Sequence, residues 1–181
     1  VHYLADRDDD ALCDYDRAVG LGSGDPFVFL RRGTLHRLAG RLSEALDDYN
    51  RVLAVEPESA VALASRGHVH YLADRDDDAL CDYDRAVGLG SGDPFVFLRR
   101  GTLHRLAGRW SEAFRDFDKV IENDSESSRG WALRGHILRL AGLHGEARSD
   151  LERALQIDPG YAWAREELEK VPRRRRWLRW R

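Results

Sequence analysis

The stretch VHYLADRDDDALCDYDRAVGLGSGDPFVFLRRGTLHRLAGR, residues 1–41, occurs again without a change at residues 69–109. The two copies are offset by 68 residues, which is twice 34. Self-similarity at a fixed period of about 20–50 residues is typical of repeat architectures, in which each repeat packs on its neighbours. The sequence therefore predicts an array of helical repeats, and such arrays provide an extended binding surface more often than a catalytic centre.

A period of 34 residues organises most of the chain when Pro57 is placed at position 32 of a repeat. Small residues then recur at positions 8 and 20, where they let two helices approach closely, and large residues recur at positions 4 and 24, where they fill the remaining space. The recurring residues are Gly33, Gly67, Gly101 and Gly135 at position 8, Ala11, Ala45, Ala79, Ala113 and Ala147 at position 20, Phe29, Leu63, Phe97 and Trp131 at position 4, and Tyr15, Tyr49, Tyr83, Phe117 and Leu151 at position 24. The predicted repeats are residues 1–25 (entering at position 10), 26–59, 60–93, 94–127 and 128–161, followed by a capping helix at 162–171 and a basic tail at 172–181.

This recurring pattern of a large residue, glycine, alanine, an aromatic residue and proline resembles the tetratricopeptide repeat (TPR) family over residues 1–161. The resemblance implies an all-α, right-handed superhelical solenoid of helix–turn–helix repeats, in which helix A lines the concave face and helix B mostly forms the outer face. The helix-ending proline of the family is kept at Pro57 and Pro159. In the copied repeats glycines end the helix instead, and Pro26 and Pro94 are expected to begin the next one.

The main departure from the family pattern is an arginine at position 7, which is usually apolar, together with an aspartate at position 23. We predict that the two pair across the contact between helices A and B, because a half-buried guanidinium needs a carboxylate partner. Arg100→Leu should then be tolerated better than Asp116→Ala, which leaves a buried charge unpaired. A ligand-binding role is the alternative for these arginines, which are Arg32, Arg66, Arg100 and Arg134.

Charge is sorted between the two helices of a repeat. Positions 1–14 of the four complete repeats hold ten arginines and no acidic residue. Without the position-7 arginines, six remain at positions 2, 6 and 12, where the resemblance places inward-facing residues. A basic, partly aromatic groove of this kind is suited to an acidic or amphipathic peptide; the alternative is that these arginines form the solvated side of helix A. The predicted groove consists of Phe27, Arg31, Thr34, Arg37, His68, Tyr71, Phe95, Arg99, Thr102, Arg105, Arg129, His136 and Arg139.

The carboxylate clamp by which some TPR proteins hold a peptide's C-terminus is not expected here. The clamp has lysine at position 5 and asparagine at position 9. Position 5 of this chain is leucine or alanine, and position 9 is threonine or histidine. An acidic ligand would have to be bound differently.

No residue pattern predicts catalysis, a metal site or a cofactor. Asp74 to Asp78 and their copy lack the glycine turn and final glutamate of a calcium loop, and aspartates at a helix start are expected to cap it and complement its dipole. His68 and His70 are two residues apart and point to different sides of a helix, so packing is favoured over zinc binding. Cys13 and Cys81 occupy one repeat position copied once, which favours a reducing, cytoplasmic location.

The two ends carry separate predictions. Val1 enters midway along a helix A, so the following helix B, with Leu12, Tyr15 and Val19, is expected to have an incompletely covered face. One interpretation is that the natural protein continues upstream, and the other is self-association through this edge. The tail combines arginine with tryptophan, which suits nucleic acid or an anionic membrane; a solvated tail, or one docked on an acidic helix face, is the alternative. The tail residues concerned are Arg173, Arg174, Arg175, Arg176, Trp177 and Trp180.

Together these features predict a non-catalytic protein–protein interaction scaffold, forming part of a larger bacterial regulatory protein and binding an acidic partner. Two alternatives stay open: nucleic-acid or anionic-surface binding through the arginine groove and the tail, and an engineered or recently duplicated array without a dedicated ligand.

Overall fold

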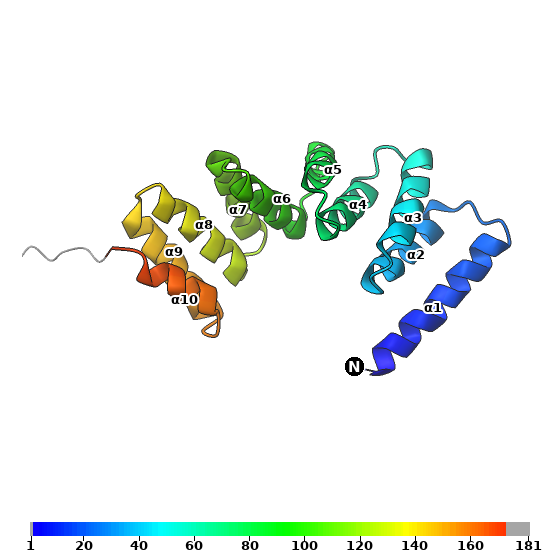
Figure 1. Ribbon diagram of the computed structural model, residues 1–181, viewed down its shortest axis with the longest axis horizontal. Coiled ribbons are helices and arrows are strands. Elements are labelled where there is room, and N and C mark those ends of the chain that lie inside the picture. The colour runs from blue at the N-terminus through cyan, green and yellow to red at the C-terminus, as the bar shows by residue number, and fades with distance from the viewer. Residues whose placement is uncertain (1, 173–181) are drawn as a thin grey trace, which may run out of the picture. The chain divides into compact units, whose positions relative to one another are not determined.

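The computed structural model describes residues 2–172, with side chains from residue 8 onward, and this part of the chain is all α-helical (Figure 1). The predicted fold class is confirmed. The helices of the described range are α1 (His2–Gly20), α2 (Pro26–Leu38), α3 (Leu42–Val55), α4 (Ala60–Leu72), α5 (Asp76–Gly88), α6 (Pro94–Leu106), α7 (Trp110–Asn123), α8 (Ser128–Leu140), α9 (His144–Ile157) and α10 (Ala162–Glu169).

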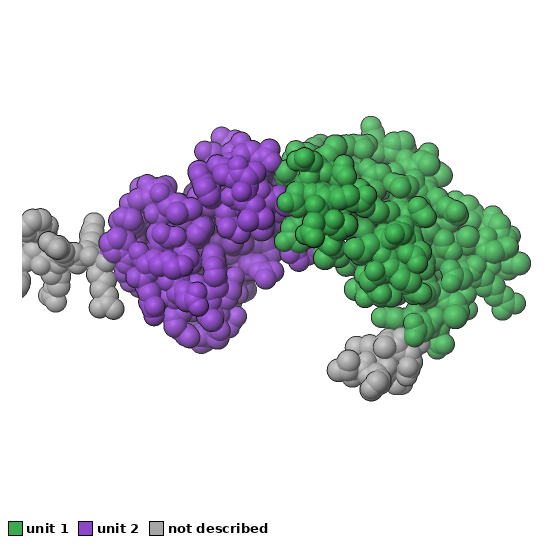
Figure 2. Space-filling model, in the orientation of Figure 1, with its two compact units in different colours: residues 1–92 green, residues 93–181 purple. Residues whose placement is uncertain are grey.

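The chain separates into two compact units, which we call the N-terminal unit (Val1–Gly92) and the C-terminal unit (Asp93–Arg181) (Figure 2). Within each unit, helices that follow one another in sequence pack together. The strongest contacts join the two helices of one repeat, as in α2 with α3 and α8 with α9, and helix B then packs on the next helix A, as in α3 with α4 and α7 with α8. Packing between sequence neighbours is what a repeat array requires.

Glycine at position 8 lets the two helices of a repeat approach closely. Gly101 of α6 lies against the Phe117 ring of α7, and a Cβ atom at Gly101 would stand 2.8 Å from Phe117 Cε1 and 2.9 Å from Asp116 Cβ. Phe117 and Ala113, at positions 24 and 20, are fully buried in the same contact. The recurring small and large residues are therefore the two sides of one interface.

Gly101→Ala is expected to lower the free energy of unfolding by about 1–2 kcal/mol. Overpacking a core typically costs about 1–3 kcal/mol, and the better helix propensity of alanine returns at most about 1 kcal/mol. Gly145→Ala on α9 is the matched control, because nothing lies within 4 Å of the added Cβ, so this variant should be neutral or slightly stabilising. Denaturant unfolding of both variants checks the prediction, and a stabilised Gly101→Ala would contradict the close approach.

The identical copies differ in structure at their first residues. Residues 70–75 end α4 and form a turn in which Asp74 has a φ of 54°, whereas residues 2–20 form the single continuous helix α1. The break expected between a half helix A and helix B is therefore absent from the first copy. A left-handed residue other than glycine costs roughly 1–2 kcal/mol, and in the second copy residues 60–68 complete a helix that packs on both α3 and α5.

The apolar side of α1 is more covered than the sequence indicated. Leu12 is 7% exposed, and Val19 packs against a cluster of Phe29, Val52 and Ala62 from α2, α3 and α4. Tyr15 is half-buried. Self-association through this edge stays a prediction.

Helix starts follow the expected signals in part. Asp25 caps α2, where Pro26 is the first residue, by accepting a hydrogen bond from the Phe27 amide at 2.9 Å. The same arrangement begins α6 at Asp93 and Pro94. At α5 the N-cap residue is Arg75, without a side-chain cap, so Asp76, Asp77 and Asp78 complement the helix dipole from the first turn but do not supply the cap.

Candidate functional site

The position-7 arginines form the predicted pairs with the position-23 aspartates. Arg32 donates from Nε to Asp48 Oδ2 at 2.8 Å and from Nη2 to Asp48 Oδ1 at 2.6 Å. The prediction of a structural pairing is confirmed in all four complete repeats, and these bidentate bonds take the four arginines out of the set of ligand candidates. The other pairs are Arg66–Asp82, Arg100–Asp116 and Arg134–Asp150.

The same arginines also reach the preceding repeat, which sequence reasoning missed. Arg32 Nη1 donates to Asp16 Oδ1 at 2.9 Å, and Arg66 Nη1 donates to Asn50 Oδ1 at 2.8 Å. Arg134 makes the equivalent bond to Asp118 in the C-terminal unit. The hydrogen bonding of Arg32 to the Asp48 carboxylate is the largest cause that raises the pKa of Arg32 above its ordinary value. A polar residue recurring at position 25 is the signal that could have predicted this contact.

Histidines at position 11 pack beside these ion pairs. His36 and His104 are 8% and 7% exposed, and their Nε2 atoms lie 3.9 Å from Asp48 Oδ2 and Asp116 Oδ2. Burial lowers the pKa of the equivalent His70 below its ordinary value. These contacts agree with the expected packing role.

The groove residues of the N-terminal unit lie on α2 and α4, which contact each other. Phe27 is 54% exposed, and the Arg31 guanidinium carbon stands 5.3 Å from the centre of its ring. Thr34 donates its hydroxyl to the Leu30 carbonyl at 2.9 Å, so this hydroxyl hydrogen is committed within the helix. The remaining predicted residues of this unit are half-buried: Arg37 on α2, and His68 and Tyr71 on α4.

The C-terminal unit repeats this arrangement on α6, whose sequence is identical to that of α2. The Arg99 guanidinium carbon stands 4.9 Å from the centre of the Phe95 ring, and Thr102 donates to the Leu98 carbonyl at 2.7 Å. Arg105 is half-buried, and its Nε atom is buried without a hydrogen-bond partner among the described residues. The predicted residues thus form one set in each compact unit.

Three further predicted residues lie on α8, and two of them already hold a carboxylate. Arg129 is exposed. His136 Nδ1 lies 2.7 Å from Glu167 Oε2, and Arg139 Nε donates to the same oxygen at 2.9 Å. Glu167 comes from α10 and is 2% exposed. Sequence reasoning did not single out Glu167, since glutamate occurs at position 6 of a helix A only there.

The charges around Glu167 set the titration of this cluster. Burial alone would raise the pKa of Glu167, but hydrogen bonds from Lys170, His136 and Arg139 together outweigh it and lower the pKa to about 2. Burial is also the largest cause that lowers the pKa of His136, with smaller contributions from Arg139 and Arg105. A neutral His136 that donates from Nδ1 to an ionised Glu167 satisfies both groups.

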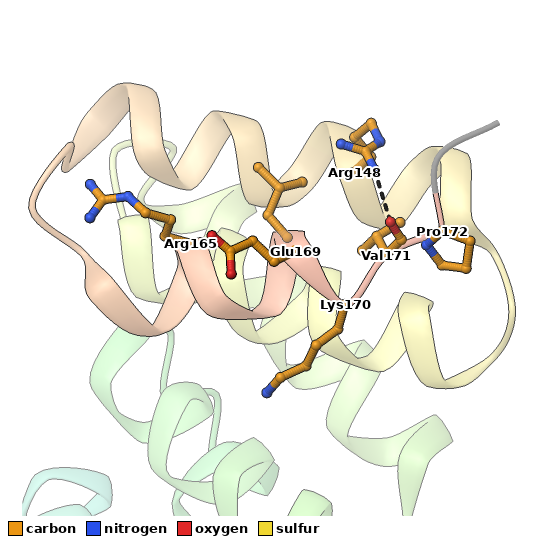
Figure 3. A pocket seen from close by; sticks show the side chains of 7 residues that line it. Arg148, Arg165, Glu169, Lys170, Val171 and Pro172 are labelled. Atoms are coloured by element: carbon orange, nitrogen blue, oxygen red, sulfur yellow. Dashed lines mark hydrogen bonds between the residues drawn. The ribbon is translucent and has the colours of Figure 1, made fainter. Parts of the chain in front are cut away.

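A second basic region lies beside α10, in a hollow of about 540 Å³ (Figure 3). Its basic side chains are committed to structural contacts. Arg148 donates to the Val171 carbonyl at 3.0 Å, Arg165 to the Pro159 carbonyl at 2.6 Å, and Lys170 to Glu167 at 2.6 Å. This hollow is therefore a poorer candidate for a binding site than the helix A surfaces.

The predicted tail site, Arg173 to Arg176 with Trp177 and Trp180, lies outside the described residues.

Cys13 and Cys81 are exposed and free. Among the described residues, no helix combines the length and the apolar character needed to cross a lipid bilayer.

Both the sequence and the structure of this chain match known proteins that are built from the same type of repeat. A family model described as tetratricopeptide repeat matches residues 30–94 and 98–162. The solved structure of YrrB, described as a TPR protein with an unusual peptide-binding site, superposes with a TM-score of 0.78 at 20% identity, covering 85% of this chain and 79% of YrrB. MamA superposes with a TM-score of 0.76 at 18% identity, covering 87% of this chain and 92% of MamA.

A third structure, the second TPR domain of human RPAP3 in complex with the HSP70 peptide SGPTIEEVD, is 25% identical, with a TM-score of 0.57 over 62% of this chain and 93% of that domain. No curated protein matches the chain.

Proposed function

The chain belongs to the tetratricopeptide repeat family, and from this premise we propose that it is a non-catalytic scaffold whose helices α2 and α6 bind acidic side chains of an extended peptide. The TPR fold and its peptide-binding relatives support a protein–protein interaction role in general. The acidic character of the ligand and its place on α2 and α6 are the specific part of the proposal.

The contact of Glu167 with α8 is the observation that carries the proposal. His136 and Arg139, at positions 9 and 12 of a helix A, hold a carboxylate oxygen at 2.7 and 2.9 Å within this chain. Positions 9 and 12 of α2 and α6 are threonine and arginine: Thr34 and Arg37, and Thr102 and Arg105. Arginine at the same helical position supplies the same donors, and α2 and α6 carry no acidic residue that would neutralise them.

Two further features support this ligand class. Arg31 and Arg99 each lie over a phenylalanine ring, an arrangement that holds a guanidinium in place. The HSP70 peptide bound by the RPAP3 domain, SGPTIEEVD, contains three acidic residues. Because lysine at position 5 and asparagine at position 9 are absent here, we place the ligand's side-chain carboxylates, rather than its C-terminus, on the arginines.

The proposal also covers the cellular compartment and the number of binding sites. The free cysteines fit a reducing, cytoplasmic compartment. Because α2 and α6 have one sequence and lie in separate compact units, each unit is expected to offer an equivalent site.

The proposal predicts that an eight-residue peptide of alternating glutamate and alanine binds at two sites per chain. Arg31→Ala with Arg37→Ala should reduce the stoichiometry to one, and combining these changes with Arg99→Ala and Arg105→Ala should abolish binding. Charge-assisted hydrogen bonds contribute about 1.5–3 kcal/mol each, so the loss of a pair weakens its site by roughly 100-fold or more. Isothermal titration calorimetry on the intact chain measures both quantities.

Two controls make this experiment specific. Arg41→Ala with Arg109→Ala removes the same number of charges from the copied segments, but these residues precede α3 and α7 and lie outside α2 and α6, so binding should persist. The matching glutamine–alanine peptide should not bind. If both double variants lost the same peptide affinity, the interaction would depend on net charge alone. If the chain bound single-stranded DNA and not the peptide, the nucleic-acid alternative would be favoured.

A further inference from the structure

The Nε atoms of Arg139 and Arg105 occupy the same place in successive helices A but differ in partner. Arg139 Nε donates to Glu167 Oε2 at 2.9 Å. Arg105 Nε is buried and has no hydrogen-bond partner among the described residues. A buried donor without an acceptor costs about 1–3 kcal/mol, so an acceptor that reaches Arg105 Nε recovers this free energy.

The acceptor of Arg139 comes from position 6 of the next helix A, which is Glu167 on α10. By the repeat register, the residue that corresponds to Glu167 for Arg105 is Leu133, at position 6 of α8, which is 7% exposed and belongs to the core cluster with Phe117 and Ile137. Leucine cannot accept a hydrogen bond. The residue at position 6 of the following helix A is therefore a carboxylate for Arg139 and an apolar side chain for Arg105.

The surroundings of Arg105 suit an anion. His136 lies near enough for the charge of Arg105 to contribute to the lowering of its pKa. Among the described residues, the carboxylate that binds in this cluster is Glu167, which Arg139 and Lys170 share. The region carries more positive than negative charge.

We propose that Arg105 Nε is the donor of a carboxylate subsite between α6 and α8, in which a ligand glutamate or aspartate takes the part that Glu167 takes at Arg139. This inference rests on the proposed function and specifies it. One acidic side chain of the peptide inserts beside Leu133 and binds Arg105. At the equivalent position beside Arg139, the carboxylate comes from Glu167 of the chain itself. Glu167 also closes that position to the peptide.

The Nε–H resonances of Arg105 and Arg139 in a ¹H–¹⁵N NMR spectrum of the intact chain test this subsite. The probe is N-acetylglutamate amide, which carries one carboxylate, and the controls are N-acetylglutamine amide and sodium chloride at the same ionic strength. The glutamate compound should shift the Arg105 Nε–H resonance downfield in a saturable manner, while that of Arg139 does not move. The Arg105→Lys variant assigns the resonance and keeps the charge.

Glu167→Gln provides the reciprocal arm. In this variant the Arg139 Nε–H resonance should move upfield and become responsive to the glutamate compound. An Arg105 resonance that does not respond, or that responds equally to chloride, overturns the subsite, even if the glutamate–alanine peptide binds elsewhere on α6. Loss of peptide binding with a specific Arg105 response would instead remove the proposed function and leave the carboxylate subsite in place.

Discussion

Asp116→Ala is expected to lower the free energy of unfolding by about 3–5 kcal/mol, the cost of breaking a buried ion pair from one side. Asp116 is 3% exposed and accepts two hydrogen bonds from Arg100, at 2.9 and 2.6 Å. Its loss removes the bidentate partner of a guanidinium whose side chain is 16% exposed. A guanidinium does not lose its proton in proteins, so the charge cannot be relieved by neutralisation.

Arg100→Leu should cost less than Asp116→Ala. The leucine adds apolar contact beside Phe97, and the remaining carboxylate keeps His104 as a neighbour, whose Nε2 lies 3.9 Å from Asp116 Oδ2. Chemical denaturation at pH 7 measures the two variants side by side.

The control for this pair is Glu122→Ala, which removes a carboxylate from the same helix, α7. Glu122 pairs with Lys119, and both side chains are about half exposed, so a change within about 1 kcal/mol is expected. If Asp116→Ala were as mild as Glu122→Ala, the row of Arg–Asp pairs would not be a source of stability.

The second large effect concerns Glu167→Gln. A fall of the Glu167 pKa from 4.5 to about 2 corresponds to about 3 kcal/mol of stabilisation at neutral pH, at roughly 1.4 kcal/mol per pKa unit. Glutamine keeps the size of the side chain but removes its charge from among Arg139, His136 and Lys170. We therefore expect the variant to unfold about 3 kcal/mol more readily at pH 7.

The pH dependence of this difference has a definite sign. A carboxyl group with a lowered folded-state pKa stabilises the fold above its unfolded-state pKa, and the stabilisation is lost as the pH falls through the window from 4.5 to about 2. The two proteins should thus converge in stability below about pH 4.5. Glu166→Gln, which changes an exposed neighbour on α10, should follow the unchanged chain at every pH. A gap that persists undiminished toward pH 2 would show that the Glu167 charge is not its source.

Contacts within one repeat could be predicted from the sequence because they recur in phase. Gly101 with Phe117, and Arg100 with Asp116, are separated by the same 16 residues in each complete repeat. A structural pairing is the simplest cause of a charged pair that repeats with such a spacing. The all-α fold followed from this periodicity.

Features that occur once could not be predicted in this way. Glu167 breaks the repeat pattern, so nothing in the sequence indicated that it would bind His136 and Arg139. The two structures of one sequence, continuous in α1 and broken at Asp74, depend on residues outside the copied segment. A local pattern contains no information about such partners, because the tertiary contacts of α4 decide where the turn forms.

The sequence predicted the candidate site residue by residue, and the structure shows that several of these residues already have hydrogen-bond partners within the chain. His136 and Arg139 bind Glu167, while Thr34 and Thr102 have committed their hydroxyl hydrogens to their own helices. In the proposed site, we therefore expect ligand binding to depend most on Arg31 and Arg37 and on their copies Arg99 and Arg105.

The central claim, that the helix A surfaces α2 and α6 bind acidic side chains, is tested most directly by mapping amide chemical-shift changes on the intact ¹⁵N-labelled chain. The titrant is the eight-residue glutamate–alanine peptide. Changes should concentrate on residues 26–38 and 94–106 and on the neighbouring helices α4 and α8, and they should weaken as salt is added. Changes confined to α3, α5, α7 and α9, or to the region beside α10, would contradict the claim.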